Sequence, residues 1–295
     1  MLRFKPIRLC DKEIFGRYIT GEGEFSCESA FINLFVWQDS YKNEWATEDG
    51  QLIIKSGEGK NTVFRLPFGD DFQRGIELIR EAAGEEYPKF WVQDGRRLDE
   101  LEDFLGTHYE LLEERNSFDY VYLRDNLAEL SGKKYHGKRN HISAFSKKYN
   151  WEYRPVTKEN ICDIKRCAEL WYEENCYRNN RHLICEKSGI NTVLDNMELL
   201  GAKGGAVYVN GEVVAFTVGS PINDGIYDIH FEKALKQYDT AYSVINREFA
   251  KRELSAYKYI NREDDMGLEG LRKAKLSYHP EMFIKKYTCI PKEQK

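Results

Sequence analysis

A chain of 295 residues with 41% hydrophobic and 32% charged residues has the composition of a folded globular protein and not of a disordered one. Its formal net charge of −5 argues against a protein that coats nucleic acid or anionic membrane along its whole surface. The sequence contains no stretch near the ~18–20 uninterrupted apolar residues of a membrane span, and its start lacks a secretion signal, so we predict a cytoplasmic protein.

The first half of the sequence predicts a mixed arrangement of helices and strands. The apolar run 29–37 fits either a buried helix or a strand, because periodicity alone does not separate the two. Two strands joined by a Gly-rich turn at 57–61 follow it. In chain order, we then expect strands at 51–56, 62–67 and 89–93, helices at 72–83 and along Leu98, Leu101 and Leu105, and extended segments at 109–113 and 118–123.

A basic segment at 131–150 separates the two halves. It contains no acidic residue, and Ile142, Phe145 and Tyr149 recur at helical spacing, which predicts an amphipathic helix with a basic outer face. We place the domain junction here. The predicted organisation is an amino-terminal domain at 1–130, a basic linking helix at 131–150 and a carboxy-terminal domain at 151–295.

The second half predicts the element order β-α-α-β-β-β-α-β-α-β. Its first helix begins at Thr157, read as the cap, and carries Ile161, Ile164, Ala168 and Trp171 on one face. The hairpin turn Asn210–Gly211 joins two of the strands. The remaining elements are strands at 151–156, 205–209, 212–220, 225–231, 257–261 and 282–289, and helices at 190–200, 240–254 and 267–276.

Two segments and the element order carry a resemblance to known families. The run KRNHISAFSKKY at 138–149, followed at once by a strand, resembles the basic helix that opens the second half of Fem-type aminoacyltransferases. The segment NREDDMGLEGLRKAKLSYHP at 261–280 looks like the signature of a bacterial family similar to the carboxy-terminal domain of phosphatidylglycerol lysyltransferase. The order of elements in the second half is similar to an acyltransferase domain of the GNAT type, whose sheet splays open between its fourth and fifth strands.

The resemblance implies an α/β (α+β) fold of two tandem GNAT-like domains with mixed, mostly antiparallel sheets flanked by helices. It also implies an enzyme that transfers an aminoacyl group to an amine or hydroxyl acceptor: a small amine, a peptide or a precursor. No cofactor is expected to be tightly bound, because an aminoacyl-tRNA or an acyl-CoA serves as co-substrate. Three functions stay open: an aminoacyltransferase that uses charged tRNA, an N-acyltransferase that uses acyl-CoA, and a non-catalytic module that binds a ligand or a protein.

The candidate bases lie on the predicted strand 225–231. Strand alternation places Asp228, His230 and Glu232 on one face, and the imidazole has an unperturbed pKa of about 6.5, which suits proton transfer at neutral pH. The alternative is that this face is simply a polar sheet surface. Just after the fifth strand, acids could bind the amino group of the donor or the acceptor, or could complement a helix dipole. These acids are Glu263, Asp264 and Asp265. Asn261 is a further candidate ligand of the donor amino group or the acceptor, and Tyr278 could lie near the leaving group or be a buried core residue.

Basic residues supply candidate phosphate ligands, with solvated surface charge as the alternative reading. The loop 232–242 contains no glycine, so every Cβ hinders the close backbone approach to pyrophosphate that is usual for acyl-CoA. The donor or phosphate ligands that we predict are Lys233, Lys236, Tyr238, Arg272, Lys273 and Lys275, and the predicted nucleic-acid contacts are Lys138, Arg139 and His141. We expect no metal site, although Cys176, His182 and Cys185 lie near one another in sequence.

Overall fold

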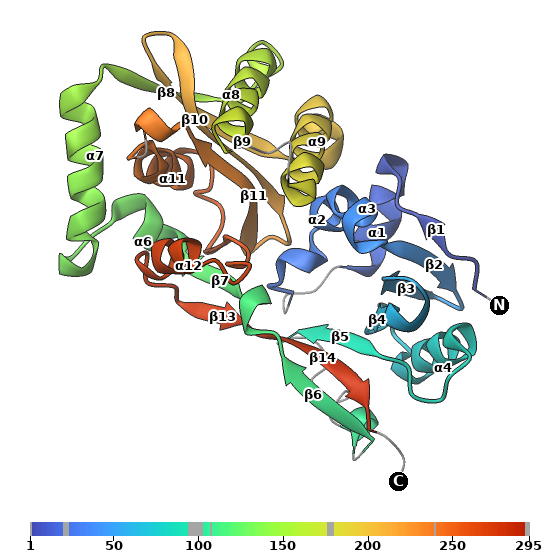
Figure 1. The fold of residues 1–295 in the computed structure, drawn as a ribbon. Helices are drawn as coiled ribbons and strands as arrows, with labels where there is room; N and C mark the ends of the chain where they lie inside the picture. The colour runs from blue at the N-terminus through green and yellow to red at the C-terminus, as the bar shows by residue number, and fades with distance from the viewer. Residues whose placement is uncertain are drawn as a thin grey trace.

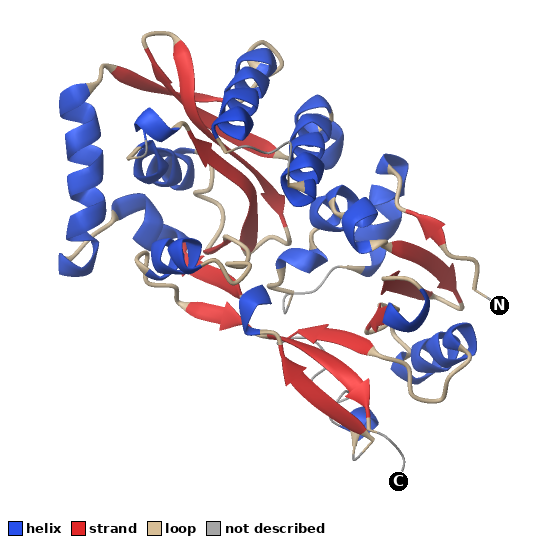
Figure 2. Ribbon diagram, viewed as in Figure 1, coloured by secondary structure: helices blue, strands red, loops and turns tan. Residues whose placement is uncertain are grey.

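The computed structural model describes residues 2–19, 24–93, 103–106, 108–175, 180–238 and 240–292. Within this part of the chain, two seven-stranded sheets form the framework, and helices flank them (Figures 1 and 2). The first sheet has the order β1 (Lys5–Pro6), β2 (Glu44–Glu48), β3 (Gln51–Ser56), β4 (Val63–Arg65), β5 (Phe90–Gln93), β14 (Lys286–Pro291) and β6 (Tyr109–Glu113). The second has the order β13 (Met282–Ile284), β7 (Asp119–Leu123), β12 (Tyr259–Asn261), β11 (Ile226–Ala234), β10 (Glu212–Pro221), β9 (Lys203–Val209) and β8 (Trp151–Pro155).

The helices form where apolar residues recur at helical spacing. In α11 (Ala241–Arg252), for example, Ala241, Val244, Ile245 and Phe249 are all buried. The other helices are α1 (Lys12–Tyr18), α2 (Phe31–Val36), α3 (Gln38–Tyr41), α4 (Phe72–Ala83), α6 (Arg124–Glu129), α7 (His136–Lys148), α8 (Ile161–Glu174), α9 (Arg181–Asp195), α10 (Met197–Leu200) and α12 (Glu269–Leu276). The expected mixed fold of two mostly antiparallel sheets flanked by helices is confirmed, with β4–β5 and β11–β12 as parallel pairs.

The two sheets exchange strands. Strand β7 belongs to the first half of the sequence but pairs with β12 and β13 in the second sheet. Strand β14 comes last in the sequence but lies between β5 and β6 in the first sheet. The single strand expected at 282–289 is therefore wrong, because the chain crosses between the sheets at Lys285. The predicted division into an amino-terminal domain at 1–130, a linking helix at 131–150 and a carboxy-terminal domain at 151–295 stays a prediction.

The second sheet is covered on both faces. Helices α6, α7 and α11 pack on one face, which we call the α11 face, around Tyr227, Val244 and Phe249. Helices α8 and α9 pack on the other, the α8/α9 face, around Phe216 and Ile190. Ile32 of α2 joins this second core, so a helix from the first half of the chain packs beside α9 (Figure 1).

A β-bulge interrupts strand β11 at His230. Ile229 pairs with Gly219 and Phe231 pairs with Val218, which leaves His230 as an extra residue without a partner on β10. Gly219 permits this local geometry, because a Cβ there would lie 2.0 Å from the Asp228 carbonyl oxygen. The residues after the bulge consequently point to the opposite face of the sheet from the one that strict alternation along β11 predicts.

The expected opening of the sheet between 225–231 and 257–261 is present. Strands β11 and β12 pair only from Ile226 to Asp228, opposite Tyr259 to Asn261. Strand β11 then continues to Ala234, while β12 ends. Beyond Asp228, this edge of β11 has no strand partner among the described residues.

Two local expectations need correction or completion. The run 29–37, compatible with helix or strand, is helical from Phe31 to Val36. Thr157 does not cap the next helix, because the Asn160 side chain accepts from the Thr157 N–H at 2.8 Å and closes a turn first, so α8 begins at Ile161. The predicted helix positions Leu98 and Leu101 lie outside the described residues. Among the described residues, no helix is long and apolar enough to cross a bilayer.

A buried ion pair joins the two sheets, and removing its cation tests its contribution. Lys286 Nζ of β14 lies 2.7 Å from Asp119 Oδ1 of β7, and both side chains are at most 1% exposed. Replacing Lys286 by Met leaves the Asp119 charge buried without its partner, so we expect a loss of about 3–5 kcal/mol in the free energy of unfolding. Urea denaturation followed by circular dichroism measures it. The exposed Lys292→Met is the control, and a loss no larger than that of the control would contradict the assignment.

Candidate functional site

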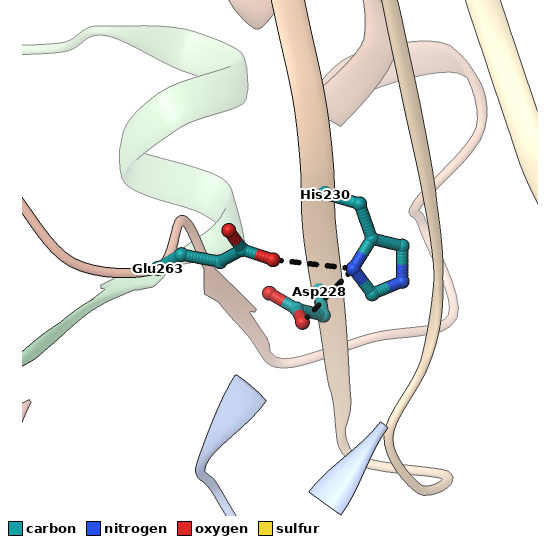
Figure 3. A group of neighbouring side chains, drawn as sticks. All are labelled: Asp228, His230 and Glu263. Carbon is teal, nitrogen blue, oxygen red and sulfur yellow. Dashed lines mark hydrogen bonds and ion pairs between the residues drawn. The ribbon is translucent and has the colours of Figure 1, made fainter. Parts of the chain in front are cut away.

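Three titratable side chains meet where the second sheet opens. His230 Nδ1 lies 3.2 Å from Glu263 Oε1 and 3.3 Å from Asp228 Oδ2 (Figure 3). Asp228 and His230 come from β11, and Glu263 comes from the segment that follows β12. Asp228 is fully buried and His230 is 8% exposed, whereas the Glu263 side chain retains 22% exposure. We call these three residues the Asp-His-Glu cluster.

The backbone around the cluster is held in unusual local conformations. The bulge sets the direction of His230, and Glu263 has a left-handed φ of 55°, which is uncommon for a residue with a side chain. The Asn261 side chain stabilises this turn, because its Oδ1 accepts from the Glu263 N–H at 2.7 Å. Its Nδ2 donates to Asp119 at 3.0 Å, which connects the turn to the buried ion pair between the sheets.

Neighbouring side chains orient the members of the cluster. Ser220 Oγ of β10 lies 2.8 Å from His230 Nε2, the ring nitrogen that faces away from the two carboxylates. Asn33 Nδ2 of α2 donates to Glu263 Oε1 at 3.1 Å. The cluster is therefore positioned by both halves of the chain, since α2 belongs to the first half and the strands to the second.

The Asp228 carboxylate is the least compensated group of the site. Neither of its oxygens has a hydrogen-bond partner among the described residues, although the side chain is fully buried. Burial, followed by the nearby negative charges of Glu263 and Asp119, raises the pKa of Asp228 well above its ordinary value. Burial likewise raises the pKa of Asp264 to about 6. A positive charge placed beside Asp228 would lower its pKa again.

The prediction that Asp228, His230 and Glu232 share one face is wrong. The bulge at His230 leaves Glu232 on the α11 face, where it forms an ion pair with Arg262 at 2.7 Å and accepts from Asn246 at 3.4 Å. Asp228 and His230 lie on the α8/α9 face beside Ser220. Glu232 therefore belongs to a different group of side chains.

That second group surrounds the ring of Tyr278, which is buried. Arg262 Cζ lies 4.8 Å from the ring centroid, and Lys138 Nζ of α7 lies 3.7 Å from it. Burial and the adjacent Arg262 charge lower the pKa of Lys138 to about 8. His141, also on α7, lies 3.4 Å from Ser243, which contacts the Tyr278 hydroxyl. We call Lys138, Glu232, Arg262 and Tyr278 the Tyr278 group.

The predicted donor ligands on β11 and the loop after it are engaged within the protein. Lys233 Nζ pairs with Glu186 at 2.8 Å and lies 4.1 Å over the Trp171 ring. The Lys236 N–H donates to the Glu174 side chain at 2.9 Å, and its ammonium donates to the Glu174 carbonyl. Tyr238 packs on Phe145 of α7 and on Tyr149, which follows it. Their role toward a donor stays a prediction.

The predicted basic residues on α12 and α7 differ in their surroundings. Arg272 makes two bonds of 2.8 Å to Asp265, and buried Lys275 donates to the carbonyls of Arg262 and Asp264. Lys273 is exposed. Arg139 donates to the carbonyls of Leu130 and Gly132 at 2.5 and 2.7 Å. Of the predicted basic residues, Lys273 is thus exposed to solvent and Lys138 lies over the Tyr278 ring.

Several residues around the site were not anticipated from the sequence. Asp119 stands in an otherwise apolar and aromatic strand, and Lys286 follows the apolar run 282–284, so an isolated charge in a buried strand was the available signal. Their pairing across 167 positions carries no local pattern. Ser220, Asn33 and Arg262 also gave no signal that separates them from ordinary polar residues.

A pocket lies against the first sheet. Within it, Glu28 accepts from Arg65 at 2.5 Å and from Trp91 at 2.6 Å. Burial opposes ionisation of Glu28, but Arg65 and Lys286 outweigh it and lower its pKa to about 2. The lining residues are Glu28, Ser29, Arg65, Leu66, Phe68, Trp91, Val92 and Gln93.

The Asp-His-Glu cluster is also the group that could hold a metal ion among the described residues, because its ligand atoms lie within 4.8 Å of one another. The cysteines and the histidine considered as metal ligands from the sequence form no comparable group among the described residues. His182 stacks on Trp37 with ring centroids 4.6 Å apart, Cys185 is half-buried, and Cys176 lies outside the described residues.

Comparison with known proteins identifies relatives of this chain. The family model described as "Phosphatidylglycerol lysyltransferase, C-terminal" matches residues 22–290. A protein of unknown function from Bacteroides thetaiotaomicron is 37% identical, with a TM-score of 0.91 over 99% of this chain and 100% of that chain. An uncharacterised protein from Mycoplasmoides gallisepticum is 25% identical over 201 residues, and the match spans 63% of each protein.

Two further structures share the fold at lower identity. L-PGS from Bacillus licheniformis is 16% identical, with a TM-score of 0.64 over 97% of this chain and 93% of that chain. FemX is 8% identical, with a TM-score of 0.59 over 97% of this chain and 96% of that chain. The expected likeness to both groups is therefore confirmed at the level of the fold.

The lowered pKa of Lys138 predicts an unusually reactive amine. Since a pKa lowered to about 8 favours the neutral form above that pH, its reactivity toward acetic anhydride should rise with a midpoint near 8. Labelling from pH 6 to 11, read by mass spectrometry, measures the midpoint. Arg262→Gln should move it upward, because a like charge is removed, and Glu232→Gln should move it downward. A wild-type midpoint at the ordinary lysine value of 10.5 would contradict the burial argument.

Proposed function

Because the chain belongs to the phosphatidylglycerol lysyltransferase C-terminal family, we propose that it is an aminoacyltransferase that moves an aminoacyl group from an aminoacyl-tRNA to an amine or hydroxyl acceptor. The observation that carries the proposal is the Asp-His-Glu cluster at the opening between β11 and β12. It combines an imidazole with two carboxylates in a mostly buried position, which is a common way to assist proton removal from a nucleophile.

In the proposed reaction, one proton is removed from the acceptor and one is gained by the leaving ribose oxygen. The acceptor nitrogen or oxygen attacks the carbonyl carbon of the aminoacyl ester, forming the new amide or ester bond. The bond between that carbon and the ribose oxygen of the tRNA breaks, and the ribose hydroxyl leaves with a proton. The cluster assists removal of the acceptor proton, and Ser220 and Asn33 hold His230 and Glu263 in place.

The loop after β11 favours a tRNA donor over acyl-CoA. In acyl-CoA-dependent enzymes of this fold, we expect free backbone N–H groups here to hold the pyrophosphate. In this chain the Lys236 N–H already donates to the Glu174 carboxylate, which also places negative charge beside the loop. Segment 232–239 has no glycine to allow closer approach. Lys138, half-buried over the Tyr278 ring on the α11 face, supplies positive charge that suits a tRNA phosphate.

A donor assay separates the candidate functions. The full chain is incubated with radiolabelled aminoacyl-tRNAs and, separately, with a panel of acyl-CoAs, and binding is measured by filter retention and calorimetry. We expect saturable retention of charged tRNA that weakens as salt rises. Saturable acyl-CoA binding without tRNA retention would replace this proposal with an N-acyltransferase. Binding of neither donor would indicate a non-catalytic module.

Substitutions in the cluster test its part in the transfer step. His230→Ala and Glu263→Gln should each lower the rate of single-turnover aminoacyl transfer by about 10²–10⁴-fold, because assistance to proton removal is lost. Donor retention on the filter should stay close to wild type. Glu198→Gln, a carboxylate on the exposed surface, is the matched control. A wild-type transfer rate in both cluster variants would move the chemistry elsewhere in the protein.

A further inference from the structure

We propose that Asp228, His230 and Glu263 form a binding site for one divalent transition-metal cation, with Zn²⁺ and Mn²⁺ as the best-suited ions. The ligand set is one imidazole nitrogen and two carboxylate oxygens. Three protein ligands with a remaining open position are typical of metal sites that also bind water or substrate.

The distances from His230 Nδ1 to the two carboxylates fit a shared ion. Two ligand atoms that each lie about 2.1 Å from a tetrahedral Zn²⁺ are about 3.4 Å apart. His230 Nδ1 lies 3.2 Å from Glu263 Oε1 and 3.3 Å from Asp228 Oδ2, and all three ligand atoms lie within 4.8 Å of one another. Figure 3 shows both carboxylates on the same side of the imidazole, facing its Nδ1.

The Asp228 side chain is an independent indication of an ion. It is fully buried, it points toward the other two ligands, and neither carboxylate oxygen has a hydrogen-bond partner in the described structure. A proton on His230 Nδ1 could be donated to only one of the two carboxylates, and the hydrogen bond in the structure is the one to Glu263 Oε1 at 3.2 Å. An ion in contact with both carboxylates and the ring would compensate Asp228 as well.

The surrounding residues provide the outer contacts that metal ligands require. A histidine bound to metal through Nδ1 carries its proton on Nε2 and donates it to an acceptor, which fixes the ring. Ser220 Oγ lies 2.8 Å from His230 Nε2 and can accept that hydrogen bond. Asn33 holds Glu263 Oε1 at 3.1 Å, so a carboxylate ligand is oriented from α2.

The site deepens the proposed function and rests on it only for its use in the transfer reaction. A cation at this position would bind the acceptor amine or hydroxyl and favour loss of its proton. Binding of the ion itself is independent of that reaction, so the two statements are tested separately.

Binding is measured on the full chain after dialysis against a chelator. Equilibrium dialysis with metal analysis, and calorimetry with the chlorides of Zn²⁺, Mn²⁺, Mg²⁺ and Ca²⁺, give stoichiometry and affinity. We expect one Zn²⁺ or Mn²⁺ per chain and at least tenfold weaker binding of Mg²⁺ and Ca²⁺, because imidazole favours the transition metals. The exposed thiols of Cys10 and Cys162 could bind Zn²⁺ but bind Mn²⁺ poorly, so the Mn²⁺ titration distinguishes the cluster from these thiols.

Variants assign the bound ion to the cluster. Asp228→Asn and Glu263→Gln should each remove the one-equivalent binding, and Ser220→Ala should weaken it by about 10–100-fold. Glu232→Gln lies on the same strand but on the opposite face of the sheet and is the matched control, with binding like the wild type. Circular dichroism checks folding. If Asp228→Asn does not fold, the partly exposed Glu263→Gln and Ser220→Ala carry the test.

The outcomes distinguish this inference from the proposed function. No one-equivalent binding in the wild type, or unchanged binding in Glu263→Gln and Ser220→Ala, overturns the metal site even if aminoacyl transfer is observed. One-equivalent binding that depends on the cluster upholds the site even if no transfer occurs, and in that case the proposed function fails alone. Transfer that stops after chelation and returns with the ion would support both.

Discussion

The buried ion pair between Lys286 and Asp119 is the contact on which the arrangement of the two sheets depends. Each residue lies on a strand that has crossed from one half of the chain into the sheet of the other. Asp119 also accepts from the Cys27 backbone at 2.8 Å and from Asn261 at 3.0 Å, so one carboxylate connects the first sheet, the second sheet and the segment before α2. Two charges in the interior are stable only while they remain paired, which makes this contact intolerant of relative displacement of the sheets.

The candidate site follows from that connection. Asn261 is held by Asp119 on one side and positions the Glu263 backbone on the other, which brings the Glu263 carboxylate to His230. The parallel pairing of β11 with β12 ends at this point, and α2 reaches across to the same carboxylate. The sheet opening, the bulge and the crossing strands therefore act together to position the cluster, and α2 of the first half orients one of its carboxylates.

Sequence reasoning succeeded where a local pattern determined the structure. The apolar spacing in 241–249 and in 142–145 predicted helices that the structure contains, and the resemblance to GNAT domains implied the opening beside β11. It failed where the cause is non-local or involves a single residue. Strict alternation grouped Glu232 with Asp228 and His230, whereas one extra residue in β11 sends Glu232 to Arg262. No periodicity reveals that 282–289 divides between two sheets, because both strands are short and partly apolar.

The position of β14 between β5 and β6 has a consequence for synthesis on the ribosome. Strands β5 and β6 emerge early, yet the strand that fills the space between them is the last of the described strands to be made. Until then their facing backbone edges lack the partner with which they pair in the finished sheet, and such edges invite contacts with other chains. Nascent protein should therefore pass through a period in which protection by a chaperone matters more for the first half of the chain than for the second.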